Sequence, residues 1–210
     1  MWWTEANKAR YSKRELLEIV ISWLVVSFCF SLQGSLQGLG FYMIFLAASL
    51  ITVGLGFVLH ELVHRHVAKR FGCYAEFRMW PWGLILALVV ALASGGRVIF
   101  AAPGAVYITP LVITPYISSR GIERVYGLIS LSGPLVNIAL AAIFHAVLNF
   151  KLDQLTYLVA KMGFNVNLWL AAFNLIPIPP LDGFKVFRWN LVVWAMVTIP
   201  TWAVMLLMAA

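Results

Sequence analysis

Long apolar runs separated by short polar segments dominate the chain. Four of these runs are long enough to cross a membrane as helices, which takes about 20 residues. They cover residues 16–33, 40–66, 126–150 and 191–209. A fifth run, 157–178, is mostly apolar but is interrupted by Asn165, Asn167 and Asn174. The pattern predicts an all-α polytopic membrane protein with about five to six transmembrane helices, in a single domain over residues 1–210.

The two ends of the chain each carry an apolar run. The first run follows a basic stretch, as the apolar part of a signal peptide would, but no clear small-residue cleavage site comes after it. We therefore expect it to be retained as the first helix. The last run stops at Ala210, which is also how a truncated sequence would end.

Residues 72–118 do not fit one spanning helix. The stretch "GLILALVVALA" at 83–93 is too short to span, and Pro103-Gly104 stands between two short β-prone runs, which indicates a turn. We expect a re-entrant or interfacial segment of two strands and a short helix, buried in protein or lining a wet cavity. A tight pair of spanning helices is the alternative, because periodicity does not separate short buried helices from strands.

Composition agrees with a membrane protein. Hydrophobic residues make up 62% of the chain and charged residues only 11%, with a mean hydropathy of +0.91, whereas a soluble domain is about half apolar and a quarter charged. The net charge is +7, but the basic residues flank the apolar runs instead of forming a stripe, so we expect no nucleic-acid partner. The two cysteines have no metal-like spacing and indicate no disulfide framework.

The basic residues also predict an orientation, because loops on the cytoplasmic side of a membrane are enriched in Lys and Arg. With the N-terminus in the cytoplasm, four basic clusters lie inside, at 8–14, 65–78, 120–124 and 185–188. Only Lys151 and Lys161 then fall clearly outside, while Arg97 is ambiguous. We predict a multi-pass protein of the cell membrane with a cytoplasmic N-terminus, in which residues 79–118 cross an even number of times or not at all.

The second apolar run carries the sequence "HELVH" at 60–64. His60 and His64 are four apart, so on a helix they share one face and both imidazoles can reach one zinc ion. Glu61 projects beside them, where a carboxylate can take a proton from water at the metal. The alternative is a polar helix end at the membrane interface, with His and Glu among lipid headgroups.

A catalytic zinc needs a third protein ligand and an open position. Of the eight acidic residues, only Glu61 and Asp182 lie at the mouth of an apolar segment beside other chemistry, so Asp182 is the leading third ligand by elimination. The prolines of "NLIPIPPLDG" at 174–183 must end the preceding helix and direct Asp182 inward. His145 is the other candidate, but it lies near the opposite end of its run, and we expect an interior histidine outside the site.

These motifs resemble those of the site-2 protease family of intramembrane zinc metalloproteases. The resemblance rests on "HELVH" in one span and "NLIPIPPLDG" in a later one, with "SGPLVN" at 132–137 similar to the family's central core helix. It covers a three-helix catalytic core over about 40–183. It implies one zinc per chain, held by His60, His64 and Asp182, with Glu61 as the general base.

The resemblance implies two further features. Asn174 would donate an N–H to the substrate carbonyl as that oxygen gains charge, although the residue alone suggests an interhelical hydrogen bond. A re-entrant β segment would follow the metal-binding helix, over about 72–118, and a strand edge there can hold a substrate extended by adding it to the sheet. The chain leaves no room for the PDZ or CBS domain of many relatives. We expect Gly133 and Pro134 to serve close helix packing and a bend. Asn137 is expected to bridge core helices and to lie outside the site.

The sequence thus predicts an intramembrane zinc metalloprotease that cleaves peptide bonds in or near transmembrane segments of other membrane proteins. Its expected partners are such a substrate and the lipid bilayer, and the mouth of its active site is expected on the cytoplasmic side. A non-enzymatic metal-binding transporter or channel is the main alternative, and an inactive relative acting as a chaperone is a third. The substrate, the cleavage position, the trigger and the oligomeric state do not follow from the sequence.

Overall fold

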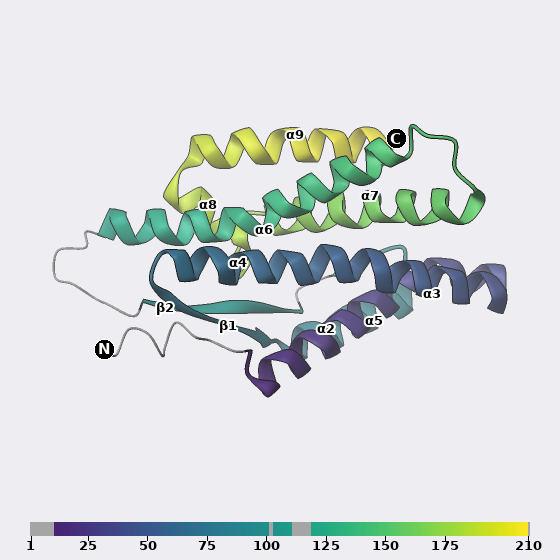
Figure 1. Cartoon of the computed structure of the whole chain (residues 1–210), viewed down its shortest axis with the longest axis horizontal. Helices are drawn as coiled ribbons and strands as arrows, with labels where there is room; N and C mark the ends of the chain where they lie inside the picture. Colours follow the sequence, from purple (N-terminus) through teal and green to yellow (C-terminus); the bar gives the residue numbers. More distant parts are fainter. Residues whose placement is uncertain (1–10, 101–102, 111–118, 210) are drawn as a thin grey trace.

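The computed structural model describes residues 11–100, 103–110 and 119–209 (Figure 1). Its main helices are α2 (Lys13–Ser31), α3 (Leu39–Val53), α4 (Leu59–Arg70), α5 (Pro81–Ser94), α6 (Ser119–Val147), α7 (Gln154–Asn174), α8 (Asp182–Trp189) and α9 (Leu191–Ala209). Two strands, β1 (Cys73–Met79) and β2 (Gly104–Pro110), form a small antiparallel sheet. A short 3₁₀ helix (Leu32–Gln37) follows α2, and a π-helical turn (Gly54–Val58) joins α3 to α4.

The predicted all-α polytopic fold is confirmed. Four helical stretches are long and apolar enough to cross a membrane, at Lys13–Ser35, Leu39–Arg70, Gly121–Val147 and Leu191–Met208. The fifth predicted run forms α7, which is as long as a span but carries polar asparagines along its length. The prediction of five to six spanning helices therefore depends on α7 and on the shorter α5.

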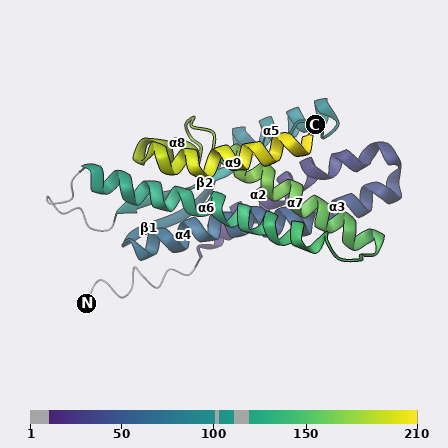
Figure 2. The ribbon, with the colours of Figure 1, turned by 90° about the horizontal axis from the view of Figure 1, so that it is seen from above.

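The helix α4 lies at the centre of the fold. In Figure 1 the strands lie on one side of α4, while α6 and α7 lie on the other, and α2 and α5 pack beyond the strands. α8 and α9 lie on the side of α6 and α7 away from α4 in Figure 1, and Figure 2 shows α9 from above. The "HELVH" motif on α4 therefore faces two long helices, while the sheet begins three residues after α4 ends.

The segment after α4 contains two strands and a short helix, as predicted, and not a pair of spanning helices. β1 pairs with β2 over seven residues, from Cys73 opposite Pro110 to Met79 opposite Gly104. The expected turn at Pro103-Gly104 was wrong, because Gly104 begins β2 and the connection between the strands is α5. Pro81 is the first residue of α5, and Gly95, in the left-handed conformation, ends the helix.

Parts of some predictions lie outside the described residues. These are the basic residues Lys8 and Arg10, the positions 101–102 and 111–118 of the re-entrant segment, and the final Ala210.

Candidate metal centre

Two histidines from α4 converge at the centre of the fold. His60 and His64 are one helical turn apart, and their Nε2 atoms lie 3.0 Å from each other. Both side chains are buried, with 5% and 6% exposure. The π-helical turn that precedes α4 is a local irregularity of the kind often found at functional sites. The predicted pair therefore shares one face and points both rings at one place.

Asp182 meets this pair from a distant part of the sequence. Its Oδ2 lies 3.1 Å from Nε2 of His60 and 2.9 Å from Nε2 of His64. The chain leaves α7 at Asn174, passes through the proline-rich loop and starts α8 at Asp182. The loop returns so tightly that a Cβ on Gly183 would lie 2.2 Å from the carbonyl oxygen of Leu175.

Hydrogen bonds on the far sides of the imidazole rings set which nitrogen faces the metal position. Nδ1 of His64 lies 2.7 Å from the carbonyl oxygen of Ile129, which can only accept, so this nitrogen carries the proton. Nδ1 of His60 lies 2.6 Å from Oδ1 of Asn137. In both rings the Nε2 lone pair is then free to bind a metal, as expected when a second group orients each ligand.

Asn137, which the sequence analysis placed outside the site, contacts one of the candidate ligands. Its Nδ2 donates to the carbonyl of Gly56 at 3.1 Å and to Oδ1 of Asn167 at 2.9 Å, so its Oδ1 must face His60. Asn167 in turn donates to the carbonyl of Gly163. Asn137 is fully buried. In the sequence, its place three residues after "SGP" in an apolar run was the feature that could have indicated this contact.

Gly133 allows α6 to approach the two candidate ligands of α4. A Cβ at this position would lie 2.4 Å from Nε2 of His64 and 2.6 Å from Nε2 of His60, distances that real Cβ atoms essentially never show. The prediction of close helix packing at Gly133 agrees with this contact. Glycine is required here by the ligands themselves.

Glu61 and Asn174 line a cavity that also contains the three predicted ligands. Its volume is about 270 Å³, and β2, the proline-rich loop and Lys185 form other parts of its wall. Glu61 is buried, and its Oε2 has no hydrogen-bond partner among the described residues. Asn174 donates to the carbonyl of Leu170 in its own helix. The described structure thus brings Glu61 and Asn174 to the site without fixing their roles.

The three ligand atoms fit a zinc ion. They lie 2.9–3.1 Å from one another, close to the edge of about 3.3 Å of a tetrahedron around zinc with bonds of 2.0–2.1 Å. They are also the one group of three or more His, Cys, Asp or Glu side chains with this proximity among the described residues. Two neutral imidazoles and one carboxylate are a common ligand set of catalytic zinc.

The other histidines lie apart from this group. His145 is near the end of α6, packed against the ring of Phe164 at 5.2 Å between centroids. It is exposed, so the expectation of an interior histidine was wrong, although its place outside the site agrees. His66 points elsewhere on α4 and accepts a hydrogen bond from Arg70.

Comparison with known proteins identifies the family. The chain is 44% identical over 200 residues to the protein named "Putative zinc metalloprotease MJ0611" of Methanocaldococcus jannaschii, which covers 95% of this chain and 96% of the relative. The chain belongs to this zinc metalloprotease family. It is also 29% identical over 153 residues, 66% of each chain, to "Putative zinc metalloprotease YwhC" of Bacillus subtilis.

Membership in a zinc metalloprotease family agrees with the chemistry of the ligand group described above. No family model and no solved structure matches the chain. The finer assignment to the site-2 type and the roles of individual residues therefore depend on the motifs and on the geometry of the site.

Proposed function

We propose that this zinc metalloprotease is of the site-2 type and cleaves peptide bonds in or near the transmembrane segments of other membrane proteins. One observation carries the proposal: His60, His64 and Glu61 are buried in a helical stretch long and apolar enough to cross a membrane, and the partly buried Asp182 meets the two histidines there. Charged and ionisable side chains are costly at such depth and mark functional sites there. A protease that acted only on soluble proteins would not need its active site among these helices.

The residues of the site supply the groups that peptide hydrolysis requires. Zinc, when held by His60, His64 and Asp182, supplies a Lewis acid that acidifies water and polarises a carbonyl group. Glu61 is the general base that takes a proton from the attacking water and later gives it to the leaving amine. Asn174 would turn its side-chain N–H from the carbonyl of Leu170 toward the substrate oxygen as negative charge develops there.

The edge of β2 that faces away from β1 offers a place for an extended substrate. Residues along an antiparallel pair alternate between those bonded to the partner strand and those whose backbone points outward. The N–H groups of Phe77 and Met79 donate away from β2, so their partners Val106 and Gly104 also point outward, from the other edge. Both line the cavity of the metal centre. A substrate segment added here as a strand would have its peptide bonds exposed to attack.

We also propose that the protein lies in the cell membrane with its N-terminus and the mouth of its active site in the cytoplasm. The start of α2 and the end of α4 lie at the same end of the molecule, because Glu15 and Arg65 form an ion pair at 3.3 Å. That arrangement supports the orientation indicated by the basic clusters, in which both ends face the cytoplasm.

Cleavage of membrane-embedded peptides tests the proposal. The purified protein would be reconstituted into phosphatidylcholine liposomes with a pooled set of tagged single-span peptides, with soluble casein as the comparison substrate. We expect cuts inside or next to the spans, found by mass spectrometry, that stop with 1,10-phenanthroline and return with added zinc. Cleavage of casein alone, or no cleavage of any span in zinc-loaded protein, would contradict the proposal.

A further inference from the structure

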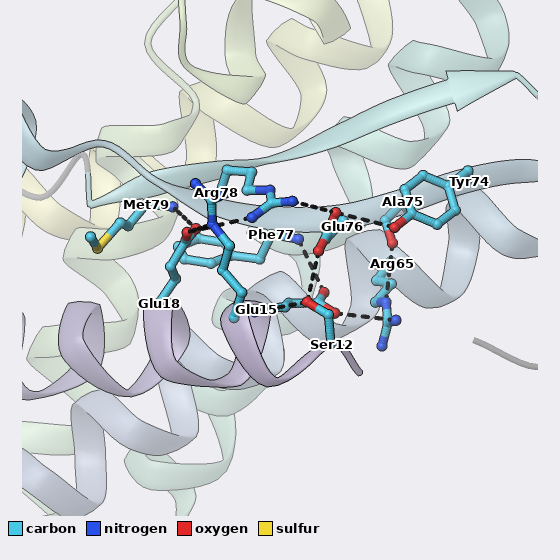
Figure 3. Close-up of polar contacts among 11 residues, drawn as sticks. Ser12, Glu15, Glu18, Arg65, Tyr74, Ala75, Glu76, Phe77, Arg78 and Met79 are labelled. Carbon is cyan, nitrogen blue, oxygen red and sulfur yellow. Dashed lines mark hydrogen bonds and ion pairs between the residues drawn. The ribbon is translucent and has the colours of Figure 1, made fainter. Parts of the chain in front are cut away.

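The outer edge of β1, opposite β2, is closed by two acidic side chains of α2. Glu15 accepts a hydrogen bond from the backbone N–H of Phe77 at 3.1 Å through its Oε1, and Glu18 accepts one from Met79 at 3.0 Å through its Oε2 (Figure 3). These N–H groups are two residues apart, and the two carboxylates are nearly one helical turn apart. The first turns of α2 thus occupy the place where a third strand would pair.

The metal-binding helix takes part in the same contact. Arg65, which directly follows the candidate ligand His64, donates from Nε to the carbonyl of Ala75 at 3.1 Å. Its Nη2 lies 3.3 Å from Oε2 of Glu15, an ion pair by distance without the alignment of a hydrogen bond. Both side chains are buried, Arg65 at 6% and Glu15 at 1% exposure. Three consecutive outward-facing positions of β1, at Ala75, Phe77 and Met79, are therefore bonded to α2 or α4.

A second layer of contacts supports this arrangement. Ser12, which caps α2, donates to Glu76 at 2.8 Å, and Arg78 lies 2.9 Å from Glu76 and 3.5 Å from Glu18. Burial acts to raise the pKa of Glu76, but hydrogen bonds from Ser12 and Tyr74 and the charge of Arg78 hold this pKa below its usual range. The carboxylate of Glu76 therefore stays ionised and keeps the start of α2 attached to the sheet.

Acidic groups at these positions are costly, which indicates that they do more than fill space. Glu15 and Glu18 are buried in a helix long and apolar enough to span a membrane, where ionisable side chains are expensive. Apolar residues at both positions could also pack against β1, but they would leave the backbone N–H groups of Phe77 and Met79 without these acceptors. An open edge on a two-stranded sheet would also accept another strand.

We propose that Glu15 and Glu18 are positioning residues for the substrate: they close the outer edge of β1, so that a strand can add only at β2, and with Arg65 they fix the sheet against the metal-binding helix. The inference rests on the proposed function, since it concerns how a substrate strand lies at the metal. Glu15 and Arg65 hold β1 against α4, and β1 pairs with β2. These contacts therefore fix the distance between the outer edge of β2 and the candidate ligands on α4.

Two probes that both bind zinc separate this role from the metal site. Acetohydroxamate binds the metal alone, whereas a peptide hydroxamate also carries a backbone that can pair with the β2 edge. Affinities of both probes would be measured for zinc-loaded parent protein, Glu18→Ala and Glu18→Gln. The control is Glu123→Ala, which removes an exposed glutamate paired with Arg188 at 3.0 Å.

We expect Glu18→Ala to lower the affinity for the peptide hydroxamate by about tenfold, which is the equivalent of one or two lost backbone hydrogen bonds. Acetohydroxamate affinity and zinc content should stay at the parent level. Glu18→Gln keeps an acceptor for Met79 and should restore most of the peptide affinity, and Glu123→Ala should change neither probe.

Several outcomes would overturn the inference. Unchanged peptide affinity in Glu18→Ala would show that the edge contact does not position a ligand, and equal losses for both probes would show a general effect on the metal site. Failure of Glu18→Gln to restore affinity would assign the effect to charge instead of the edge. If zinc-loaded parent protein bound the peptide hydroxamate no more tightly than acetohydroxamate, the proposed pairing of a substrate strand with β2 would itself be contradicted.

Hydrogen exchange gives a readout that needs no ligand. In the parent, the amide of Met79 should exchange slowly although it lies on the outer edge of its sheet. In Glu18→Ala this amide should exchange clearly faster, with the amide of Phe77 less affected because Glu15 remains. Fast exchange of Met79 in the parent would contradict the closed edge.

Discussion

Replacing Glu61→Gln is expected to abolish peptide-bond cleavage while leaving zinc in place. Glutamine has nearly the same shape but cannot take a proton from water, and general acid–base groups contribute typically about 10²- to 10⁴-fold to a rate. Glu61 does not belong to the candidate ligand group of His60, His64 and Asp182, so the substitution leaves that group intact. The measurement is the cleavage rate of a reconstituted single-span peptide, with zinc counted in the same preparation.

The matched control is Glu123→Gln, a conservative change on an exposed glutamate of α6. It should keep full activity and full zinc. Cleavage at the parent rate in Glu61→Gln would remove Glu61 from the mechanism. The same variant separates the alternatives, because metal transport or a chaperone role would largely survive a change that stops hydrolysis.

Replacing Gly133→Ala is expected to weaken zinc binding strongly. The added Cβ would lie 2.4 Å from Nε2 of His64, and neither histidine can simply move away, because each is held through Nδ1 by Ile129 or Asn137. Disturbing the groups that orient metal ligands typically costs about 10- to 100-fold in affinity. We expect at least this loss of zinc affinity, measured by competition with a chelator.

The control for this change is Gly40→Ala on α3, where an added Cβ meets nothing within 4 Å. This variant should bind zinc as the parent does, because a helical glycine replaced by alanine in open space introduces no contact. Parent-like zinc affinity in Gly133→Ala would mean that α6 does not approach the ligands as closely as the structure places it.

Much of the site follows from local sequence. The spacing in "HELVH" places His60 and His64 on one face of any helix, and the prolines before Asp182 end α7 wherever it lies. The meeting of Asp182 with the two histidines depends on how α4, α7 and α8 pack, which local pattern does not contain. Elimination among the eight acids selected Asp182 because, apart from Glu61, no other acid stood at the mouth of an apolar segment beside other candidate chemistry.

The parts that were missed depend on long-range contacts. Asn137 looked like one of several asparagines in apolar runs, and only its position against His60 and Gly56 distinguishes it. The edge contact of Glu15 and Glu18 was missed for the same reason, since both residues lie at the start of α2, more than 50 residues before β1. Two strands were predicted in this segment, but on either side of Pro103-Gly104; β2 begins at Gly104, whereas its partner β1 lies before α5 and was not located.

Zinc content tests the central claim most directly. Zinc per chain would be measured in purified parent protein, in Asp182→Ala and in Asp153→Ala, which removes an exposed aspartate at the start of α7. The account predicts about one zinc per chain in the parent and in Asp153→Ala, and a clear loss in Asp182→Ala. Zinc-free parent protein, or stoichiometric zinc that survives Asp182→Ala, would contradict a metal centre built from His60, His64 and Asp182.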